Sequence, residues 1–417
     1  MQNSSKYFRY TLDDLKKSAD RKLFNVVSFF AGGGGSSCGY KLAGGDVLCV
    51  NEFQQVHGEA YSANFPDTPV IIDDIRNVEP ADIRKIIGNV DIDILDGSPP
   101  CPPFSMAGKK REGWGKEKMA YGWKQKNIED LTFDQVRLVT ELQPKVTICE
   151  NVKGLTMDYA RDYLNMMLKE FEDCGYIMTH KVLNGWEYGV PQKRERIFMV
   201  GVRNDVADKI GMNWMTIGNI YPEPDRGEKP TIRDAIEDLQ KDPDNMKDAE
   251  ELYDSMKNSS KGHWIHGFET HPDFPNSGPC KGLKGVENRE KVVSIGDDIV
   301  GPWFDEQIKN GIIKSDDRKS SYYMSRIVPY NQASHSLTEQ GLNHKFMGGN
   351  HFHPEEYRIY TLREAQRIMS LPDDYKHKGS LEDSQARIGL MVAPLCLYYL
   401  AKSINEKVLE PYGNINS

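Results

Sequence analysis

The feature that most restricts the fold is an apolar run at residues 26–30 that leads directly into four consecutive glycines at positions 32–35. The run has the composition of a buried strand, and a helix-like stretch to Ala43 follows the glycines. Strand, glycine turn and helix in this order are typical of nucleotide binding in open α/β sheets, because glycine lets the backbone approach a ligand and a helix N-terminus favours an anion. Such a turn taken alone is more often only a tight turn.

Carboxylates follow the next two predicted strands. The strand at residues 46–51 ends at Glu52, about 20 positions beyond the glycines, where a ribose-binding carboxylate is expected. The strand at residues 70–72 is followed by Asp74 and Ile75. Asp74 can accept a hydrogen bond from an adenine amino group while Ile75 packs on the ring. The alternatives are a solvated glutamate and, more commonly for an aspartate here, a turn residue.

A single cysteine, Cys101, has prolines on both sides. An apolar run at residues 91–95 predicts a buried strand that leads into it. Proline fixes φ and restricts the residue before it, so the thiol is held in one position, as a nucleophile requires. The alternative is a buried, inert cysteine, which is the more common state of a lone cysteine.

Residues 106–126 form a basic, aromatic segment in a chain whose formal net charge is −9. The segment has seven Lys or Arg against two Glu, together with Trp114, Tyr121 and Trp123, and it shows neither helical nor strand periodicity. Basic groups suit phosphates and aromatic rings suit bases, so we expect a nucleic-acid contact here, with a solvated linker as the alternative. Because the whole chain is acidic, any nucleic-acid surface is local.

The chain then alternates between predicted helices and strands. A helix at 131–142 precedes a strand at 146–149 that ends at Glu150, and a helix at 157–174 precedes a strand at 177–183. Ligands of open α/β sheets bind at the carboxyl ends of the strands. Glu150 is therefore expected at the same edge as the glycine turn.

Two arginines alternate along a further predicted strand at residues 190–202. Arg194 and Arg196 are two positions apart, which places both on one face of a strand. A pair of guanidinium groups on one face suits a carboxylate, a phosphate or a base edge. The alternative is an exposed basic strand edge.

The strand–helix alternation ceases from about residue 203 to 354, where Asp, Asn, Lys, Pro and Gly are frequent. This predicts a separate, irregular domain. Thr361 and Glu364 then have the spacing of a capping box at the start of a helix, and Thr11 is expected to cap a short helix near the N-terminus. An apolar helix at 385–405 is expected to return to the core of the first domain.

Composition excludes several other classes of protein. Seven scattered cysteines without a CxxC pair argue for reduced thiols, and against a disulfide framework or a zinc site. No apolar run approaches the roughly 20 residues of a membrane span, and the polar N-terminus does not resemble a signal peptide. We therefore expect a cytoplasmic two-domain protein of the α/β class, with no metal and no membrane partner.

Taken in this order, the segments resemble the DNA (cytosine-5)-methyltransferase family over about residues 25–203 and 320–405. The matching motifs are Phe30-Ala31-Gly32-Gly33-Gly34-Gly35, Pro99-Pro100-Cys101 with Phe104-Ser105, Glu150-Asn151-Val152, Gln192-x-Arg194-x-Arg196, and the segment from Gly348-Gly349-Asn350 through Arg358 and Thr361 to Pro372-Asp373. The resemblance implies a Rossmann-like S-adenosylmethionine-dependent methyltransferase sheet. It also implies a first catalytic part at residues 1–203, a smaller, irregular target-recognition domain at 204–356, and a segment at 357–417 that returns to the catalytic domain.

The resemblance further implies a DNA cytosine-C5 methyltransferase that flips its target base out of duplex DNA. Cys101 would add to C6, Glu150 would hydrogen-bond N3 and the exocyclic amine, and Arg194 would support the base, with Arg196 completing the catalytic set. The methyl donor would be S-adenosyl-L-methionine. The implied cofactor contacts are Phe30, Gly32, Gly33, Gly35, Glu52, Phe53, Asp74, Ile75, Pro100, Leu131 and Val392, and the implied DNA contacts are Ser105, Lys109, Lys110, Arg111 and Gln192.

Two positions depart from the family pattern. Pro102-Pro103 stands where the family commonly has Gln after the catalytic cysteine, and Gly389-Leu390-Met391-Val392 stands where it has Gly-Asn, a small residue and Val. The second change replaces a polar and a small side chain near the cofactor with apolar, bulky ones, which leaves a variant S-adenosylmethionine donor as an alternative.

The expected partner is duplex DNA, bound by a monomer, with a cognate restriction endonuclease acting separately. Two further alternatives stay open. One is an RNA cytosine-C5 methyltransferase on the same scaffold, and the other is a nucleic-acid binder that has kept the fold without the reaction.

Overall fold

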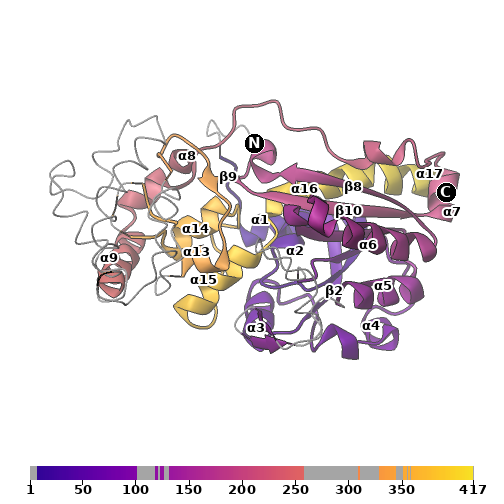
Figure 1. Ribbon diagram of the computed structural model, residues 1–417, viewed down its shortest axis with the longest axis horizontal. Helices are drawn as coiled ribbons and strands as arrows, with labels where there is room; N and C mark the ends of the chain where they lie inside the picture. Colours follow the sequence, from indigo (N-terminus) through magenta and orange to yellow (C-terminus); the bar gives the residue numbers. More distant parts are fainter. Residues whose placement is uncertain are drawn as a thin grey trace.

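A seven-stranded sheet forms the centre of the computed structural model, which describes residues 7–100, 118–120, 123–125, 131–257, 309, 328–343, 351–354, 356 and 358–416 (Figure 1). The strand order is β3-β2-β1-β4-β7-β10-β8. The strands are β1 (Phe24–Phe29), β2 (Gly45–Glu52), β3 (Val70–Ile72), β4 (Ile94–Gly97), β7 (Val146–Val152), β8 (Tyr176–Asn184) and β10 (Glu195–Arg203). The predicted α/β class is confirmed.

Strand direction places the predicted functional segments at one edge of this sheet. Strands β1, β2, β3, β4 and β7 are parallel, whereas β10 runs antiparallel to both β7 and β8. The carboxyl ends of the parallel strands carry the glycine turn, Glu52, Asp74, Pro100 and Glu150. In an open sheet this shared edge is where ligands bind.

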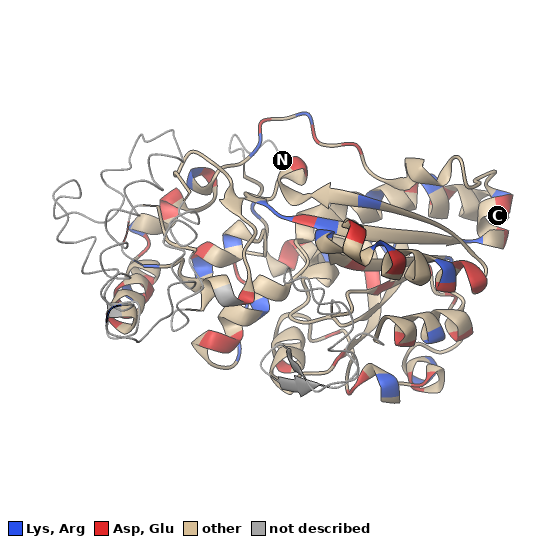
Figure 2. Ribbon diagram, viewed as in Figure 1, with Lys and Arg blue, Asp and Glu red and all other residues tan. Residues whose placement is uncertain are grey.

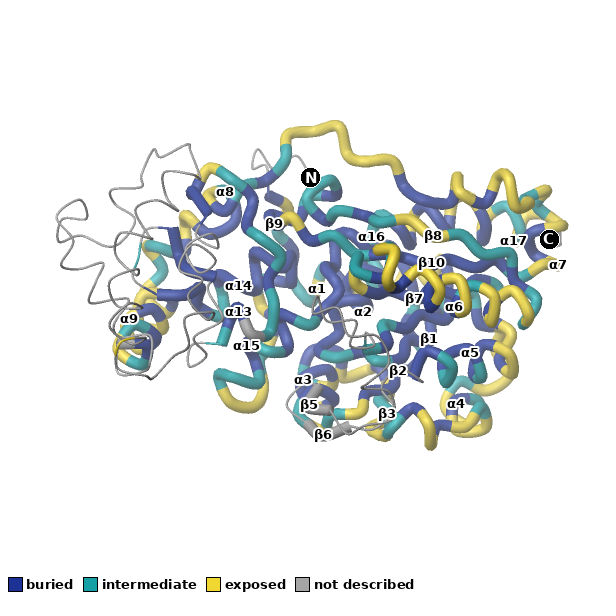
Figure 3. The backbone as a smooth tube through the Cα atoms, in the orientation of Figure 1, coloured by how far each residue is buried: buried dark blue, intermediate teal, exposed yellow. Residues whose placement is uncertain are grey.

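Side-chain alternation divides the apolar residues of the sheet between two cores. Val26 and its neighbour Ile94 face the helices α1 (Leu12–Ala19), α2 (Gly35–Leu42) and α16 (Pro394–Ile404), whereas Val27 and Leu95 face α4 (Pro80–Ile87), α5 (Leu131–Leu142) and α6 (Arg161–Asp173). Successive strand residues point to opposite faces, so a strand buried on both sides is apolar throughout. Figure 3 shows the central strands of the sheet buried, the edge strand β8 partly exposed, and the outer faces of α4, α5 and α6 exposed.

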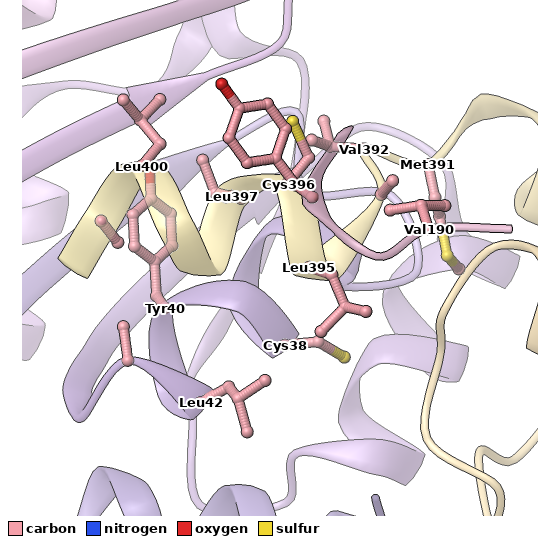
Figure 4. Close-up of a cluster of buried hydrophobic side chains, with 14 of the residues drawn as sticks. Cys38, Tyr40, Leu42, Val190, Met391, Val392, Leu395, Cys396, Leu397 and Leu400 are labelled. Carbon is pink, nitrogen blue, oxygen red and sulfur yellow. The ribbon is translucent and has the colours of Figure 1, made fainter. Parts of the chain in front are cut away.

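Helices α2 and α16 pack closely on the first of these faces (Figure 4). A Cβ at Gly39 of α2 would lie 2.7 Å from the Pro394 carbonyl oxygen and 2.9 Å from Leu397 Cβ. A glycine is therefore required at position 39 by space and not by backbone conformation. Leu395 and Cys38 lie beside this contact in the same core.

The predicted continuous helix at residues 385–405 is wrong. It is divided into α15 (Leu381–Leu390) and α16, with Met391 and Ala393 in extended conformation between them. Proline at position 394 begins α16 and disfavours helical conformation in the residue before it, which accounts for the break. A π-helical turn and α17 (Glu410–Asn416) continue the chain.

Within the described residues, one helical segment, Leu381–Ile415, is long and apolar enough to cross a membrane, judged by length and composition alone. The sequence alone predicts no apolar run that approaches the length of a membrane span, so it did not anticipate this segment. The most apolar window of the segment is 78% buried inside the protein, which is the pattern of a core helix.

A second group of helices lies beside the sheet domain (Figure 1). It contains α8 (Ile232–Ile236), α9 (Pro243–Lys257), α13 (Glu339–Leu342) and α14 (Leu362–Ile368), with α14 packed on α8 and α13 packed on α15. The capping box predicted at Thr361 and the N-cap predicted at Thr11 are confirmed, and Thr11 also forms a capping box with Asp14. The domain boundaries at residues 204 and 357 stay predictions; α7 (Asn204–Lys209), just beyond the first, packs against β8 and β10.

Several smaller elements complete the described structure. Helix α3 (Gln55–Asn64) follows β2, and the two-residue strands β9 (Gln192–Lys193) and β11 (Ser334–His335) pair in parallel. The basic segment, predicted without periodicity, contains a short antiparallel pair, β5 (Lys118–Ala120) and β6 (Trp123–Gln125). Figure 2 shows acidic and basic residues interspersed along α4, α5 and α6, so these helices present no uniformly basic face.

Candidate active site

A cavity of about 200 Å³ opens at the carboxyl edge of the sheet. Its wall combines the glycine turn, the end of β2, the end of β7, the chain leading to Cys101, and the break between α15 and α16. The predicted site residues that line it are Phe30, Gly32, Gly35, Glu52, Phe53, Asp74, Ile75, Pro100, Leu131, Glu150, Arg194, Arg196 and Val392. Segments that are far apart in the sequence thus meet in one pocket.

The glycine turn and Glu52 are hydrogen-bonded to each other. Glu52 Oε2 accepts from the Gly32 amide at 2.7 Å, and Oε1 accepts from the Gln54 amide at 2.8 Å. Gly32 has φ of 53°, and Phe30 before it has φ of 55°, which is uncommon for a residue with a side chain and costs energy. Burial raises the pKa of Glu52, while its hydrogen bonds oppose that rise.

Asp74 and Ile75 line the pocket at the end of β3. Asp74 caps a 3₁₀ turn, and its carboxylate accepts from Arg76 Nε at 2.9 Å and from Arg76 Nη2 at 2.5 Å. Burial opposes ionisation of Asp74, but the bonds from Arg76 prevail and its pKa is lowered. A carboxylate has about four acceptor positions, so Asp74 keeps capacity for a further donor.

Glu150 and Arg196 form the polar centre of the opposite wall. Strand β7 runs to Val152, and its pairing with β10 sets Glu150 opposite Phe198. Arg196 Nε lies 3.3 Å from Glu150 Oε1. Burial raises the pKa of Glu150, and the two nearby arginines, Arg196 and Arg194, act in the opposite direction.

The backbone before the predicted nucleophile is tied to the same strand. Asn151 Nδ2 donates to the Pro99 carbonyl at 3.1 Å. Pro100, the last described residue before Cys101, lines the pocket. A glycine turn with a strand-end carboxylate, a Glu–Arg pair and a Pro-Pro-Cys entry therefore share one site.

A profile of C-5 cytosine-specific DNA methylases matches residues 24–406. This chain belongs to that family. It is 31% identical over 393 residues to the type II methyltransferase M.PspPI of Psychrobacter sp., an alignment that covers 91% of this chain and 79% of that protein. It is 27% identical over 407 residues to the type II methyltransferase M.XorII of Xanthomonas oryzae, with 92% and 84% covered.

Solved structures share the fold of this methylase at low identity. A prophage-encoded E. coli protein described as a DNA modification methyltransferase aligns with a TM-score of 0.55 at 21% identity, covering 93% of this chain and 99% of that one. The Dnmt2 methyltransferase of S. pombe aligns with a TM-score of 0.52 at 16% identity, covering 94% and 99%. The Rossmann-like, S-adenosylmethionine-dependent fold predicted for the chain is confirmed.

Arg194 of the methylase does not continue the strand that carries Arg196. The predicted continuous strand at 190–202 is wrong, because Arg194 lies between β9 and β10. Its guanidinium is buried and donates to the carbonyls of Leu337 at 2.7 Å, Met391 at 2.7 Å and Gly389 at 3.2 Å. These bonds join the second group of helices to the pocket wall, which makes Arg194 a structural link at the rim of the site.

Gln192 is also inside the protein, and its prediction as a DNA contact is wrong in this structure. It is 0% exposed. Its Nε2 donates to the Ile368 carbonyl at 2.9 Å and its Oε1 accepts from the Leu337 amide at 2.9 Å. Both ends of the side chain are used to hold the second group of helices.

Gly33, predicted as a cofactor contact, does not line the pocket. A Cβ at this position would lie 2.4 Å from Tyr375 Oη and 2.5 Å from Arg387 Cδ. The space a side chain would need is therefore filled by residues that come from the C-terminal third of the chain.

Five predicted residues lie outside the described part of the chain. They are the catalytic candidate Cys101 and the candidate DNA contacts Ser105, Lys109, Lys110 and Arg111. Their roles stay predictions from the sequence.

His57 and Arg387 are among the buried residues of the methylase pocket that sequence reasoning missed. His57 Nδ1 lies 3.8 Å from Glu52 Oε1, and burial lowers the pKa of His57 to about 4. Neither residue belongs to a short motif, so only the folded chain identifies them. Among the described residues, no group of three His, Cys, Asp or Glu is placed to hold a metal ion, and the metal-free site stays an expectation.

Proposed function

We propose that this methylase transfers the methyl group of S-adenosyl-L-methionine to C5 of a cytosine flipped out of duplex DNA. One observation carries the proposal. Glu150 and Arg196, 3.3 Å apart, share a single pocket with the Glu52–glycine turn and with Pro100, which precedes Cys101. A base-binding pair, a nucleoside-binding turn and a thiol-bearing segment at one edge suit transfer of a group to a base.

The described residues fit the adenosine part of the donor. Glu52 is hydrogen-bonded to the turn on one side and has acceptor positions left for ribose hydroxyls. Asp74 and Ile75 line the same wall, where an amino group and a flat ring would lie. When bound, the donor supplies an electrophilic methyl group on a sulfonium.

The reaction follows from the poor nucleophilicity of cytosine C5. The Cys101 thiolate adds to C6, N3 takes a proton from Glu150, and C5 thereby gains enamine character. C5 would then take the methyl group as the S–CH3 bond breaks and the sulfonium becomes a neutral thioether. A base would remove the C5 proton, and the electron pair of that C–H bond would form the C5–C6 double bond and expel the Cys101 thiolate. The ring regains its aromatic form, and Glu150 recovers its proton as N3 is deprotonated.

The environment of Glu150 suits an acid that donates to N3. Burial raises its pKa and so favours the protonated form, and Arg196 beside it stabilises charge as the proton moves. Because both terminal nitrogens of Arg194 donate to backbone carbonyls, we assign support of the base to Arg196 and a positioning role to Arg194. This changes the assignment that the resemblance implies.

We propose duplex DNA as the substrate and a separately acting restriction endonuclease as the functional partner. The relatives M.PspPI and M.XorII carry the name type II methyltransferase, which supports this pairing. Ser105, Lys109, Lys110 and Arg111 are the proposed DNA contacts, and one chain forms the active unit. An RNA substrate and a variant donor are outcomes that the experiment below separates.

The test is mass spectrometry of nucleosides from duplex DNA incubated with the protein and S-adenosyl-L-methionine. The expected product is 5-methylcytosine. Modification of transfer RNA and not of DNA would overturn the substrate, and a heavier C5 adduct obtained with a cell extract as donor source would overturn the donor.

Replacing Glu150 with glutamine is expected to lower turnover by roughly 10²- to 10⁴-fold, because an amide cannot deliver a proton to N3. Single-turnover methylation of duplex DNA measures this loss. Binding of S-adenosyl-L-homocysteine should stay unchanged.

The matched control is Glu141→Gln on the exposed surface of α5, which should keep full turnover. If Glu150→Gln were as active as the unmodified protein, proton delivery by Glu150 would be disproved.

A further inference from the structure

An arginine that belongs to none of the predicted motifs lines the donor pocket. Arg387 stands in the last turn of α15, is 1% exposed, and lies next to Gly389 and Met391 in the pocket wall. Arginine is rarely buried this far unless its charge is compensated.

The guanidinium of Arg387 is only partly satisfied by the protein. Nη2 donates to the Lys378 carbonyl at 2.6 Å and weakly to the Val56 carbonyl at 3.4 Å. Nε and Nη1 are buried and have no hydrogen-bond partner among the described residues. Buried charged donors without partners are costly, so this group is suited to an anion that arrives with a ligand.

The glycine at position 33 makes room for this arginine. A Cβ there would lie 2.5 Å from Arg387 Cδ and 2.2 Å from Met391 Cε. Tyr375 holds the same turn, since its hydroxyl donates to the Gly33 carbonyl at 2.8 Å. Arg387 is thereby packed directly against the glycine turn, and in such a turn the absence of side chains lets the backbone approach a ligand.

Leu390, which stands where the family pattern has a polar Asn, explains why the position of Arg387 matters for the pocket. Residues three apart on a helix lie on the same side, so Arg387 and Leu390 are neighbours on α15. Leu390 and Met391 line the pocket but offer no polar side-chain atom. Arg387 is then the charged side chain that this end of α15 brings to the pocket.

We propose that Arg387 binds the α-carboxylate of the methionine part of S-adenosyl-L-methionine, in place of a polar side chain at position 390. The inference rests on the proposed donor site. The sulfonium and the α-ammonium of the donor are cationic, so the carboxylate is the one group of its amino-acid part that a guanidinium attracts. A charge-assisted hydrogen bond from a desolvated arginine is strong and selective for such an anion.

The experiment compares two ligands that differ only in this carboxylate, S-adenosyl-L-methionine and decarboxylated S-adenosylmethionine. Binding to the full-length protein without DNA is measured by isothermal titration calorimetry. Arg387→Met is expected to lower the affinity for S-adenosyl-L-methionine by roughly 10- to 100-fold. The affinity for decarboxylated S-adenosylmethionine should stay unchanged. The matched control Arg161→Met, on the exposed face of α6, should alter neither.

The outcomes are distinct. If Arg387→Met lowered the affinity for both ligands equally, the role of Arg387 would be merely structural. If it lowered the affinity for neither, Arg387 would have no role in binding. Each result overturns the inference. Should Arg387→Met not fold, Arg387→Lys keeps the charge and the stem, and a selective loss of at least about threefold for the carboxylate ligand is expected. If the unmodified protein bound neither ligand, the proposed donor site itself would fail.

Discussion

Replacing Cys101 with alanine is expected to reduce methyl transfer to duplex DNA by roughly 10⁴-fold or more, in the range seen when a covalent nucleophile is removed. Without the thiolate adduct at C6, cytosine C5 stays a poor nucleophile, and neither Glu150 nor Arg196 can replace that step. Binding of S-adenosyl-L-homocysteine should be unchanged, because most of the proposed donor contacts, such as Gly32, Glu52 and Asp74, come from segments of the chain distant from Cys101. Single-turnover transfer of a labelled methyl group measures the loss.

A trapping experiment makes the Cys101 prediction specific. In DNA that carries 5-fluorocytosine at the target, C5 has no proton to lose, so the adduct persists. The unmodified protein should form a covalent complex that survives denaturing electrophoresis, and Cys101→Ala should not. Cys174→Ala, at the end of α6 and outside the pocket, is the matched control and should trap normally. Retained methylation by Cys101→Ala would show that another group is the nucleophile.

Replacing Arg358 with methionine is expected to lower the free energy of unfolding by about 3 to 5 kcal/mol, because it leaves the buried carboxylate of Glu364 without its partner. The two side chains are 2% and 0% exposed, and two hydrogen bonds of 2.7 and 2.9 Å join them. Asn245 of α9 also donates to Glu364, at 3.2 Å. The pair therefore holds α9, the start of α14 and the segment before it together.

The measurement for Arg358→Met is urea unfolding followed by tryptophan fluorescence, with stability compared at neutral pH. Lys169→Met removes one partner of an exposed ion pair on α6 and should leave the midpoint unchanged, as expected for surface pairs. A midpoint equal to that of the unmodified protein in Arg358→Met would contradict the assignment of this pair as a buried brace.

The Arg358–Glu364 pair also predicts how the free energy of unfolding changes with pH. Burial alone would raise the pKa of Glu364, but Arg358 and His353 outweigh it and lower that pKa from 4.5 to about 2. A carboxyl group whose pKa is lower in the folded state stabilises the fold above its unfolded pKa and loses this contribution as the pH falls through its folded pKa. The stability difference between the unmodified protein and Glu364→Gln should therefore be largest above pH 4.5 and shrink toward pH 2.

Local sequence patterns predicted the sheet and most of the edge that forms the site. Helix α5 and strand β3 occupy the residues that the patterns indicated, and the N-cap at Thr11 and the capping box at Thr361 form as expected. Each of these features depends on residues a few positions apart, through strand alternation, helix periodicity or cap spacing. Thirteen predicted site residues line one pocket, and those that follow β1, β2, β3, β4 and β7 meet there because parallel strands bring their carboxyl ends to one edge.

Local patterns did not predict contacts with partners distant in the chain. Gln192 and Arg194 are residue types that suit a nucleic-acid or base contact, yet Gln192 bonds to a carbonyl 176 residues away and Arg194 to one 197 residues away. The break between α15 and α16 had a local signal in Pro394, but the general apolar character of the segment hid it. Arg387 had no local signal at all.

The sequence by itself determined the α/β class, which strands end in candidate site residues, and which chemical groups those residues carry. Short-range sterics and side-chain alternation decide these features. Tertiary structure alone decided which charged groups are buried, which are committed to internal bonds, and which stay available in the pocket. Arg194 and Arg387 are buried through packing between distant segments, since Arg194 bonds to Leu337 and Met391 and Arg387 packs on Val56 and Gly33. For a buried polar side chain, that packing decides whether the group stabilises the fold or is available to bind a ligand.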